Sequence, residues 1–287
     1  YLVGEEARPA VLVMGDAGAP LFATALVDYY RSGASRLTFV NGSSTDGVTY
    51  NGGALYWPKT DGTRNDCFER IFLTVAPRFE EVLPNLPNPK SPWMHETGTR
   101  LWIAHVASDR ARDYAYWADI ASYGMTRLVV TDHETGWRDG GESFTFRTNT
   151  APKKGGDASQ AEYARKMRAL GFLYGIYNNY TDYSPVNGFW QEDRVARTTN
   201  GEWITAWARC YSPKPSRAVE LEALIAPIIQ QKFQLSTTYC DVHTALEPWR
   251  RTDYDARVPG AATFAATYYA YGELLRLASK ASQQDAN

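Results

Sequence analysis

Polar side chains that could do chemistry come directly after short apolar runs in the second part of the chain. They are His105, then Asp132, His133 and Glu134, then Asn178 and Asn179, and finally Asp241 and His243. If these runs are parallel strands, their carboxyl ends share one edge of a sheet, where the catalytic residues of barrel enzymes lie. Asp241 follows Thr-Thr-Tyr-Cys, so a buried run delivers one carboxylate to a strand end. Such a carboxylate beside aromatic rings can be a glycosidase nucleophile, and the alternative is that it caps the next loop.

The chain is rich in aromatic side chains, with nine Trp and 19 Tyr among 287 residues. Aromatic faces stack on sugar rings, although large aromatics also fill ordinary cores. Four tryptophans in expected loops are candidate stacking platforms: Trp137, Trp190, Trp207 and Trp249. We expect them on one side of the sheet, with at least one beside Asp241. Candidates for binding sugar hydroxyls are Asp132, Arg209, Arg250 and Arg251, although the arginines could equally pair with surface acids.

Metal-assisted hydrolysis is a rival chemistry. It would require four strand-end residues to converge on one ion: His105, Asp132, His133 and His243. No H-x-H or H-E-x-x-H spacing supports this, and the chain has only four His. A serine nucleophile is disfavoured because no G-x-S-x-G elbow occurs. The sequence therefore predicts neither a metal nor another cofactor.

Strands and helices alternate in the part of the chain that carries these residues. We expect strands at 101–107, 127–131, 172–177 and 237–241, and helices at 108–124 (capped by Ser108), 159–171 (opened by a capping box, Ser159 to Glu162), 218–233 and 261–280. Four βα units imply a parallel sheet with right-handed crossovers. No Gly-rich phosphate turn follows a strand, and long loops follow the second and third strands, so a (β/α)8-type barrel is favoured over a doubly wound sheet. Only four of eight units are visible, so the barrel is expected to be incomplete in this chain.

A proline-rich segment, residues 83–92, precedes this α/β region and is expected to be an extended connector. Before it, β-type runs at 11–14, 37–40 and 70–75 alternate with Asn-Gly and Asp-Gly turns, and one helical stretch is expected at 21–30. We therefore predict a β-rich, sandwich-like domain at residues 1–92 and a barrel catalytic domain at residues 93–287.

The charge balance narrows the choice of partners. Thirty basic against 32 acidic residues give a net charge of −2, which argues against a nucleic-acid footprint. No apolar stretch approaches the ~20 residues that a membrane-spanning helix needs. Three cysteines, Cys67, Cys210 and Cys240, specify no disulfide framework. The compartment stays open, with a secreted or periplasmic location favoured, and the predicted partner is an oligosaccharide or glycan.

Five stretches together resemble a group of bacterial glycoside hydrolases that have a β-sandwich followed by a catalytic barrel. They are Asn-Gly-Ser-Ser-Thr-Asp-Gly (41–47), Tyr-Asn-Gly-Gly-Ala-Leu-Tyr (50–56), Arg-Ile-Phe-Leu-Thr-Val-Ala-Pro (70–77), Leu-Pro-Asn-Leu-Pro-Asn-Pro (83–89) and Tyr-Cys-Asp-Val-His-Thr (239–244). This group is similar in plan to retaining α-galactosidases and endo-α-N-acetylgalactosaminidases. In those enzymes the nucleophile is an Asp that ends the fourth barrel strand, and the resemblance implies this role for Asp241.

The resemblance also implies a general acid on a later strand, and no such strand follows Asp241. Either a loop acid, Asp253 or Asp255, replaces it, or the natural protein continues past Asn287 and completes the barrel, or this chain packs its open edge on another chain. The prediction is a retaining glycoside hydrolase that acts on an α-linked sugar. Predicted substrate contacts are His105, Asp132, His133, Trp137, Asn178, Trp207, Arg209, His243 and Trp249. The alternatives are a non-catalytic carbohydrate-binding protein and a metal-dependent hydrolase.

Overall fold

The computed structural model describes residues 11–16, 18–38, 53–83, 91–106 and 109–283, which form two compact units. The first unit consists of Tyr1–Pro89, Ala196–Trp203 and Ala245–Tyr269, and the second of Lys90–Val195, Ile204–Thr244 and Ala270–Asn287. Most of the expected connector, and the motif at 41–47, lie outside the described residues. The domain boundary between residues 92 and 93 therefore stays a prediction.

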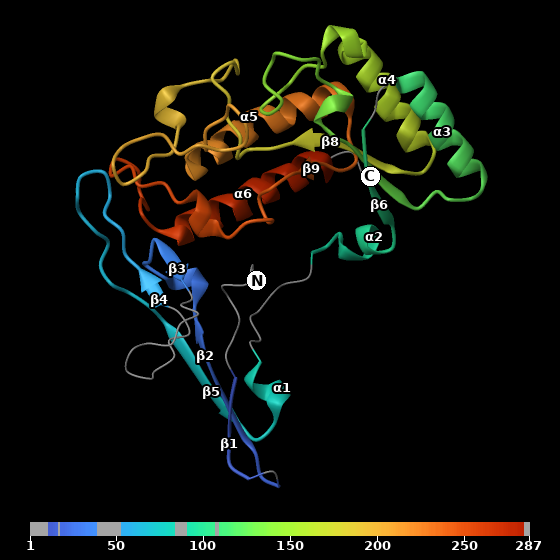
Figure 1. Cartoon of the computed structure of the whole chain (residues 1–287). Coiled ribbons are helices and arrows are strands. Elements are labelled where there is room, and N and C mark those ends of the chain that lie inside the picture. Colours follow the sequence, from blue (N-terminus) through green and yellow to red (C-terminus); the bar gives the residue numbers. More distant parts are fainter. Residues whose placement is uncertain (1–10, 17, 39–52, 84–90, 107–108, 284–287) are drawn as a thin grey trace. The chain divides into compact units, whose positions relative to one another are not determined.

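The first unit is an antiparallel β region (Figure 1). Its three-stranded sheet has the order β1 (Val11–Met14), β2 (Leu21–Val27), β5 (Ile71–Ala76), and a separate pair joins β3 (Arg36–Thr38) to β4 (Gly53–Leu55). Short helical segments are η2 (Tyr29–Arg31), α1 (Phe79–Val82) and η6 (Pro248–Arg251). The β-rich character predicted for this part of the chain is confirmed.

The helix expected at 21–30 is wrong, because this segment is mostly the central strand β2. Phe22 pairs with Val13 on one side and with Ala76 on the other. A short apolar run has no decisive periodicity of its own, and hydrogen bonding to two neighbouring strands decides its conformation.

Late segments of the sequence contribute to the core of the first unit. Trp249 packs edge-on against Phe264, with ring centroids 5.6 Å apart, beside buried Ala34 and Leu37. Hydrogen bonds between distant segments are short: the Ser35 hydroxyl donates to the Ala262 carbonyl at 2.6 Å. Segment 245–269 therefore belongs to this unit by its packing and not only by its position.

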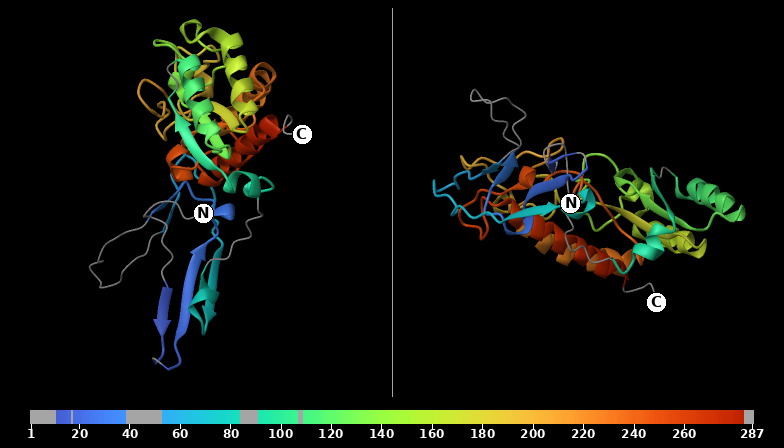
Figure 2. Two further views of the ribbon diagram at one scale, coloured as in Figure 1. Left: turned by 90° about the vertical axis from the view of Figure 1, so that its right-hand side faces the viewer. Right: turned by 90° about the horizontal axis from the view of Figure 1, so that it is seen from below.

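The second unit contains a parallel four-stranded sheet in the order β6 (Leu101–His105), β7 (Leu128–Asp132), β8 (Leu173–Asn178), β9 (Tyr239–Cys240). Its helices are α2 (Met94–Gly98), α3 (Arg110–Ser122), α4 (Gly156–Ala169), α5 (Pro215–Phe233) and the part of α6 (Phe264–Gln283) that follows residue 269, with 3-10 turns η3 (Glu134–Gly136), η4 (Pro152–Lys154) and η5 (Glu192–Arg194). The α/β class with a partial (β/α) barrel is confirmed, and α3 and α4 lie side by side in both orientations of the molecule (Figures 1 and 2).

All four helices begin two or three residues away from their expected starts; α5 begins at Pro215 instead of residue 218, and α6 at Phe264 instead of residue 261. Asp109 caps α3, since its carboxylate accepts from the Arg112 N–H at 2.8 Å, whereas Ser108 lies outside the described residues. The expected capping box is inside α4, which begins at Gly156 after Gly155 in a left-handed conformation (φ +88°). There Ser159 accepts from Arg110 at 3.2 Å instead of capping a helix. Gly155 in its left-handed conformation ends the preceding turn η4, and α4 follows directly.

The parallel sheet presents two faces that differ in chemistry. We call the side that carries Trp102, Thr131, His133, Tyr177 and Tyr239 the inner face, and the side that carries His105, Asp132, Tyr174, Asn178 and Cys240, where α3 to α5 pack, the helix face. The indole N–H of Trp102 donates to the Thr131 hydroxyl at 3.0 Å, and the Trp102 ring lies 5.6 Å from Tyr239. Successive side chains of a strand alternate between the faces, so neighbours in sequence separate.

Candidate functional site

Asp241 directly follows β9, at the carboxyl edge of the parallel sheet. Its backbone N–H donates to the Asn178 carbonyl at 3.0 Å, which extends the pairing with β8 by one residue. Its Oδ1 accepts from the Val242 N–H at 2.9 Å and from the Tyr239 hydroxyl at 3.3 Å. The side chain is half-buried, so one carboxylate at a strand end is both fixed and accessible.

The turn after Asp241 is strained and is held by His243. Val242 has φ +73°, an unfavourable conformation for a β-branched residue, and such outliers gather at functional sites. His243 Nδ1 lies 2.7 Å from the Asp241 carbonyl oxygen, which can only accept, so Nδ1 carries the hydrogen. His243 is 6% exposed and packs on the Tyr271 ring at 4.9 Å. This buried side chain braces the Asp241 backbone, and its role as a substrate contact stays a prediction.

Aromatic rings and acids surround the inner-face end of β8. The His133 ring lies 4.8 Å from Tyr177, and Tyr177 lies 5.6 Å from Tyr239 in an edge-to-face arrangement. Burial raises the pKa of the Tyr177 hydroxyl, which accepts from Asn179 Nδ2 at 3.0 Å. Three carboxylates raise it further: Asp241, Glu134 and Asp182. Tyr177 is thus a neutral, buried hydroxyl at the centre of an acidic edge.

Trp207 is an exposed aromatic on an ordered turn of the β8–α5 loop. Asp182 accepts from Asn179 Nδ2 at 2.7 Å and from the backbone N–H of Trp207 at 3.1 Å. This carboxylate therefore connects the turn to the end of β8. Ala208 has φ +46°, and the Trp207 side chain is 73% exposed. Arg209 is exposed beside it. Both predicted residues are available to a ligand.

Asp132 lies on the helix face, away from the inner face that carries Tyr239. It is completely buried, and the Tyr174 hydroxyl donates to its Oδ2 at 2.5 Å. Burial raises the pKa of Asp132 to about 7, although the bond from Tyr174 and the charge of Arg110 oppose the shift. The side chain presents no surface and its contacts are those of the core, so the binding of sugar hydroxyls by Asp132 stays a prediction.

Three other predicted contacts are packed away from solvent, and a fourth, His105, is half-buried. His105 lies on the helix face, 3.7 Å from Asp113 and edge-on to Trp117. Asn178 is 6% exposed and donates to the Tyr180 hydroxyl. Trp137 is 1% exposed, and Trp249 belongs to the core of the first unit. His105 and Asn178 do end strands β6 and β8, but a strand end offers only one of two faces to a ligand.

Trp190 and Arg250 also have packing or pairing partners, and Arg251 is half-buried beside Arg250. Trp190 is half-buried, with its ring 4.7 Å from Tyr183. In the first unit, Arg250 pairs with Glu247 at 2.6 Å, and the Arg251 carbonyl accepts from Thr267. Of the four expected platforms, Trp207 is therefore the exposed one.

The candidate general acids of the loop have structural partners in the first unit. Asp253 Oδ1 accepts from the Arg197 N–H at 2.8 Å and from the Asp255 N–H at 3.2 Å. Asp255 pairs with Arg257 at 2.6 Å. Across the described part of the chain, no three His, Cys, Asp or Glu side chains lie close enough to hold a metal ion. The rival metal site therefore lacks a ligand cluster there.

The sequence reading missed Tyr177, Tyr239 and Asp182 as parts of the candidate site. The sequence does carry a signal for the tyrosines. Alternate residues of a strand lie on one face, so Tyr239 shares its face with Asp241, and Tyr177 pairs with Tyr239 in register. No local signal marks Asp182, whose partners are set by the fold of a long loop.

Solved structures share this fold. No family model and no curated protein matches the sequence. The chain is similar to the α-N-acetylgalactosaminidase NagBb from Bifidobacterium bifidum, in complex with Gal-NHAc-DNJ, with a TM-score of 0.66 and 14% identity over 95% of this chain and 48% of that one. It is also similar to a variant of the GH36 α-galactosidase AgaA from Geobacillus stearothermophilus (TM-score 0.52, 11% identity, 96% and 42% covered) and to the α-galactosidase from Lactobacillus brevis (0.51, 9%, 96% and 41%).

The chain spans about half the length of the solved structures it matches. No helix in the described ranges has an apolar stretch long enough to cross a bilayer. At these identities the likeness concerns the fold, and the resemblance inferred from the sequence is confirmed at that level. Over about 95% of its length, this chain has the fold of part of NagBb and of the GH36 α-galactosidases.

Proposed function

We propose that the protein is a retaining glycoside hydrolase that acts on an α-linked sugar, with Asp241 as its nucleophile. The observation that carries the proposal is the position of Asp241, a half-buried carboxylate directly after the fourth parallel strand and beside Tyr239. The fold shared with an α-N-acetylgalactosaminidase and with α-galactosidases supports the same class of reaction.

The contacts of Asp241 indicate which oxygen attacks. Oδ1 accepts from Val242 and Tyr239, so Oδ2 is the oxygen presented to the anomeric carbon. Attack forms a glycosyl ester and breaks the bond to the leaving oxygen, which takes a proton from a second carboxyl group roughly 5–5.5 Å away. That group, then a carboxylate, removes a proton from water, which attacks the anomeric carbon and restores Asp241 with retained configuration.

Trapping the intermediate tests the nucleophile directly. A 2-fluoro α-glycoside should label the protein on the peptide that contains Asp241, and aryl α-galactosides and α-N-acetylgalactosaminides should be hydrolysed equally well with and without a chelator. Label on another carboxylate, or turnover by Asp241→Asn at the wild-type rate, would refute the assignment.

The general acid can be sought among the acids that share the surroundings of Tyr177 with Asp241, namely Glu134 and Asp182. Glu134→Gln and Asp182→Asn are the matched variants. Loss of the acid should slow substrates with poor leaving groups much more than activated aryl glycosides, and azide should restore the rate. If neither variant behaves in this way, the acid comes from another part of the protein.

Carbohydrate binding without turnover is the second candidate. It is favoured by one observation, that the loop acids Asp253 and Asp255 are committed to backbone and Arg257 contacts. A saturable response to α-galactosides in calorimetry, with no product after prolonged incubation and no 2-fluoro label, would support this function over hydrolysis.

A further inference from the structure

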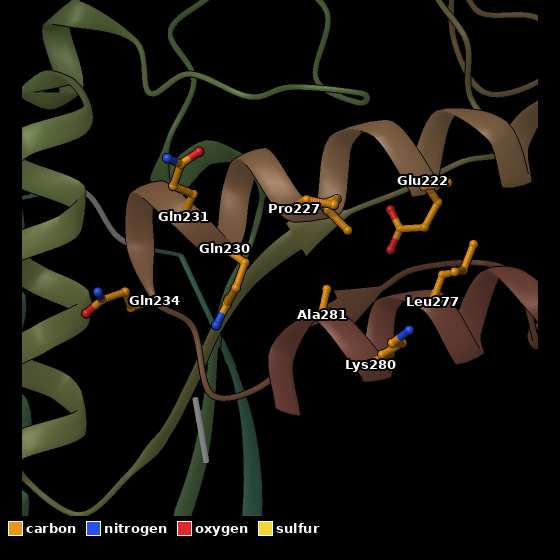
Figure 3. Close-up of a pocket in the computed structure, with 10 residues that line it drawn as sticks. Glu222, Pro227, Gln230, Gln231, Gln234, Leu277, Lys280 and Ala281 are labelled. Carbon is orange, nitrogen blue, oxygen red and sulfur yellow. The ribbon is translucent and has the colours of Figure 1, made fainter. Parts of the chain in front are cut away.

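A pocket of about 510 Å³ lies between α5 and α6 of the second unit, away from the inner face (Figure 3). Residues of both helices line it, among them Glu222, Ala223, Pro227, Leu277, Lys280 and Ala281. The volume falls within the range of small-molecule sites. The pocket shares no lining residue with the carboxyl edge that carries Asp241, so what it binds does not depend on the proposed hydrolysis.

Glu222 places a buried carboxylate in this pocket. The residue is 3% exposed, and the Tyr180 hydroxyl hydrogen bonds to its carboxyl group. Its Oε2 has no hydrogen-bond partner among the described residues, and Figure 3 shows the carboxylate directed into the space between the two helices. A buried polar atom without a partner costs about 1–3 kcal/mol, which a ligand that supplies a donor would recover.

A second acceptor of the lining lies one residue further along α5, on Ala223. Proline has no N–H, so the Ala223 carbonyl lacks the helical hydrogen bond that residue 227 would otherwise donate. Ala223 and Pro227 both line the pocket. A primary ammonium group carries three N–H donors and a positive charge, and it therefore suits a carboxylate oxygen and a carbonyl together.

The opposite helix adds a complementary charge. Lys280 lies on the exposed side of α6, and apolar Leu277 and Ala281 lie on the same helix (Figure 3). The lining thus runs from the Glu222 carboxyl group on α5 across apolar side chains to the Lys280 ammonium group on α6. A single carboxylate is too few ligands for a divalent cation, whereas a molecule with opposite charges at its two ends matches both walls.

We propose that this pocket binds a small amino carboxylate, with its ammonium group on Glu222 and the Ala223 carbonyl, its carbon chain against Pro227, Leu277 and Ala281, and its carboxylate on Lys280. The test is calorimetry with 4-aminobutanoate, 5-aminopentanoate and 6-aminohexanoate. We expect one of them to bind with 1:1 stoichiometry at least tenfold more tightly than pentylamine or pentanoate, each of which lacks one charge.

Variants separate binding from folding. Glu222→Gln keeps an acceptor for Tyr180 and should weaken the best probe at least tenfold, with the melting temperature retained, and Lys280→Met should weaken it severalfold. The matched control is Glu220→Gln on the same helix, an exposed residue paired with Arg217, which should leave binding unchanged. No 1:1 binding of any probe at millimolar concentration, equal affinity for pentylamine, or unchanged affinity in Glu222→Gln would overturn the proposal.

Discussion

The carboxyl groups on the two sides of the parallel sheet differ in their exposure to solvent. On the inner face, Asp241 is half-buried and fixed by hydrogen bonds that leave Oδ2 unengaged. Asp132 on the helix face and Glu222 on α5, which packs on that face, are 0% and 3% exposed, and burial raises the pKa of each to about 7. The inner face therefore leaves a carboxyl group accessible to a ligand, whereas the helix side encloses carboxyl groups whose pKa lies near neutral pH.

The difference comes from the period of two in a strand. Asp132 and His133 are adjacent in sequence, yet the first bonds to Tyr174 among the helices and the second packs on Tyr177 at the inner face. Cys240 and Asp241 separate in the same way. A shift of one residue in register would exchange each pair, so the identity of the accessible acid depends on register more than on residue type.

The largest effect is expected from replacing the accessible acid. Asp241→Asn should lower kcat by at least about 10⁴-fold, because the amide cannot form the glycosyl ester, while substrate binding changes little. Steady-state kinetics on aryl α-glycosides and calorimetry with the product sugar measure the two effects separately. The control is Asp132→Asn on the helix face, which should keep kcat within a few-fold. A greater loss in Asp132→Asn than in Asp241→Asn would reverse the comparison between the faces.

The next effect concerns the brace behind Asp241. His243→Ala removes the donor to the Asp241 carbonyl and should lower kcat by roughly 100-fold with KM nearly unchanged, because a displaced nucleophile loses its line of attack. His243→Asn places an amide N–H near the position of Nδ1 and should recover much of the rate. A rise in KM with unchanged kcat would instead identify His243 as a substrate contact, as the sequence suggested.

Much of the second unit could be predicted from its sequence because its signals are local. Strands β6 to β9 and the helices after them follow apolar runs, caps and glycines, and Asp241 stands out as the carboxylate after a buried run. The side on which Asp132, His105 and Asn178 lie could not be read in this way, because each strand end was treated as a single position with no assigned face.

The features that escaped prediction depend on contacts between distant residues. β2 resembles a helix in isolation and becomes a strand by pairing with β1 and β5. Trp249 was placed in a loop beside the sheet, but its packing on Phe264 and Leu37 assigns it to the first unit. The unpaired oxygen of Glu222 has no sequence signature at all, since residue 222 reads as one position of an amphipathic helix.

Replacing the buried acid Asp132 is expected to have a moderate effect, on the pH dependence of stability. The pKa of Asp132 rises from 3.8 in the unfolded chain to about 7 in the fold, so between these values the folded state keeps a proton that the unfolded chain releases. The contribution of Asp132 is therefore present at low pH and is lost as pH rises from about 4 to about 7, with a limit of about 4 kcal/mol. Asp132→Asn should be more stable than the wild type at pH 8 by about 1–3 kcal/mol.

Urea unfolding at pH 5 and pH 8 measures this change. The Asp132→Asn protein should show about half the wild-type loss of stability between the two pH values, because Glu222 contributes with the same sign. Asp119→Asn, at an exposed position of α3, is the matched control and should retain the full loss. If Asp132→Asn lost as much stability between pH 5 and pH 8 as the wild type, the Asp132 carboxyl group of the wild type would be ionised in the folded state at pH 5. The contrast between the faces would then rest on exposure alone.

The smallest effect is expected from removing the exposed ring of Trp207, on the loop that follows β8. Trp207 is 73% exposed, and Asp182 accepts from its backbone N–H, so the turn that presents the ring is fixed while the ring itself is open to a sugar. One stacking contact contributes on the order of 1 kcal/mol, so Trp207→Ala should raise KM by about three- to tenfold and leave kcat nearly constant.

Tyr116→Ala removes a comparably exposed ring from α3, on the helix face, and should change neither constant. Equal responses of the two variants would show that Trp207 is only a surface aromatic. A loss confined to Trp207→Ala would extend the accessible inner-face site from Asp241 along the β8–α5 loop.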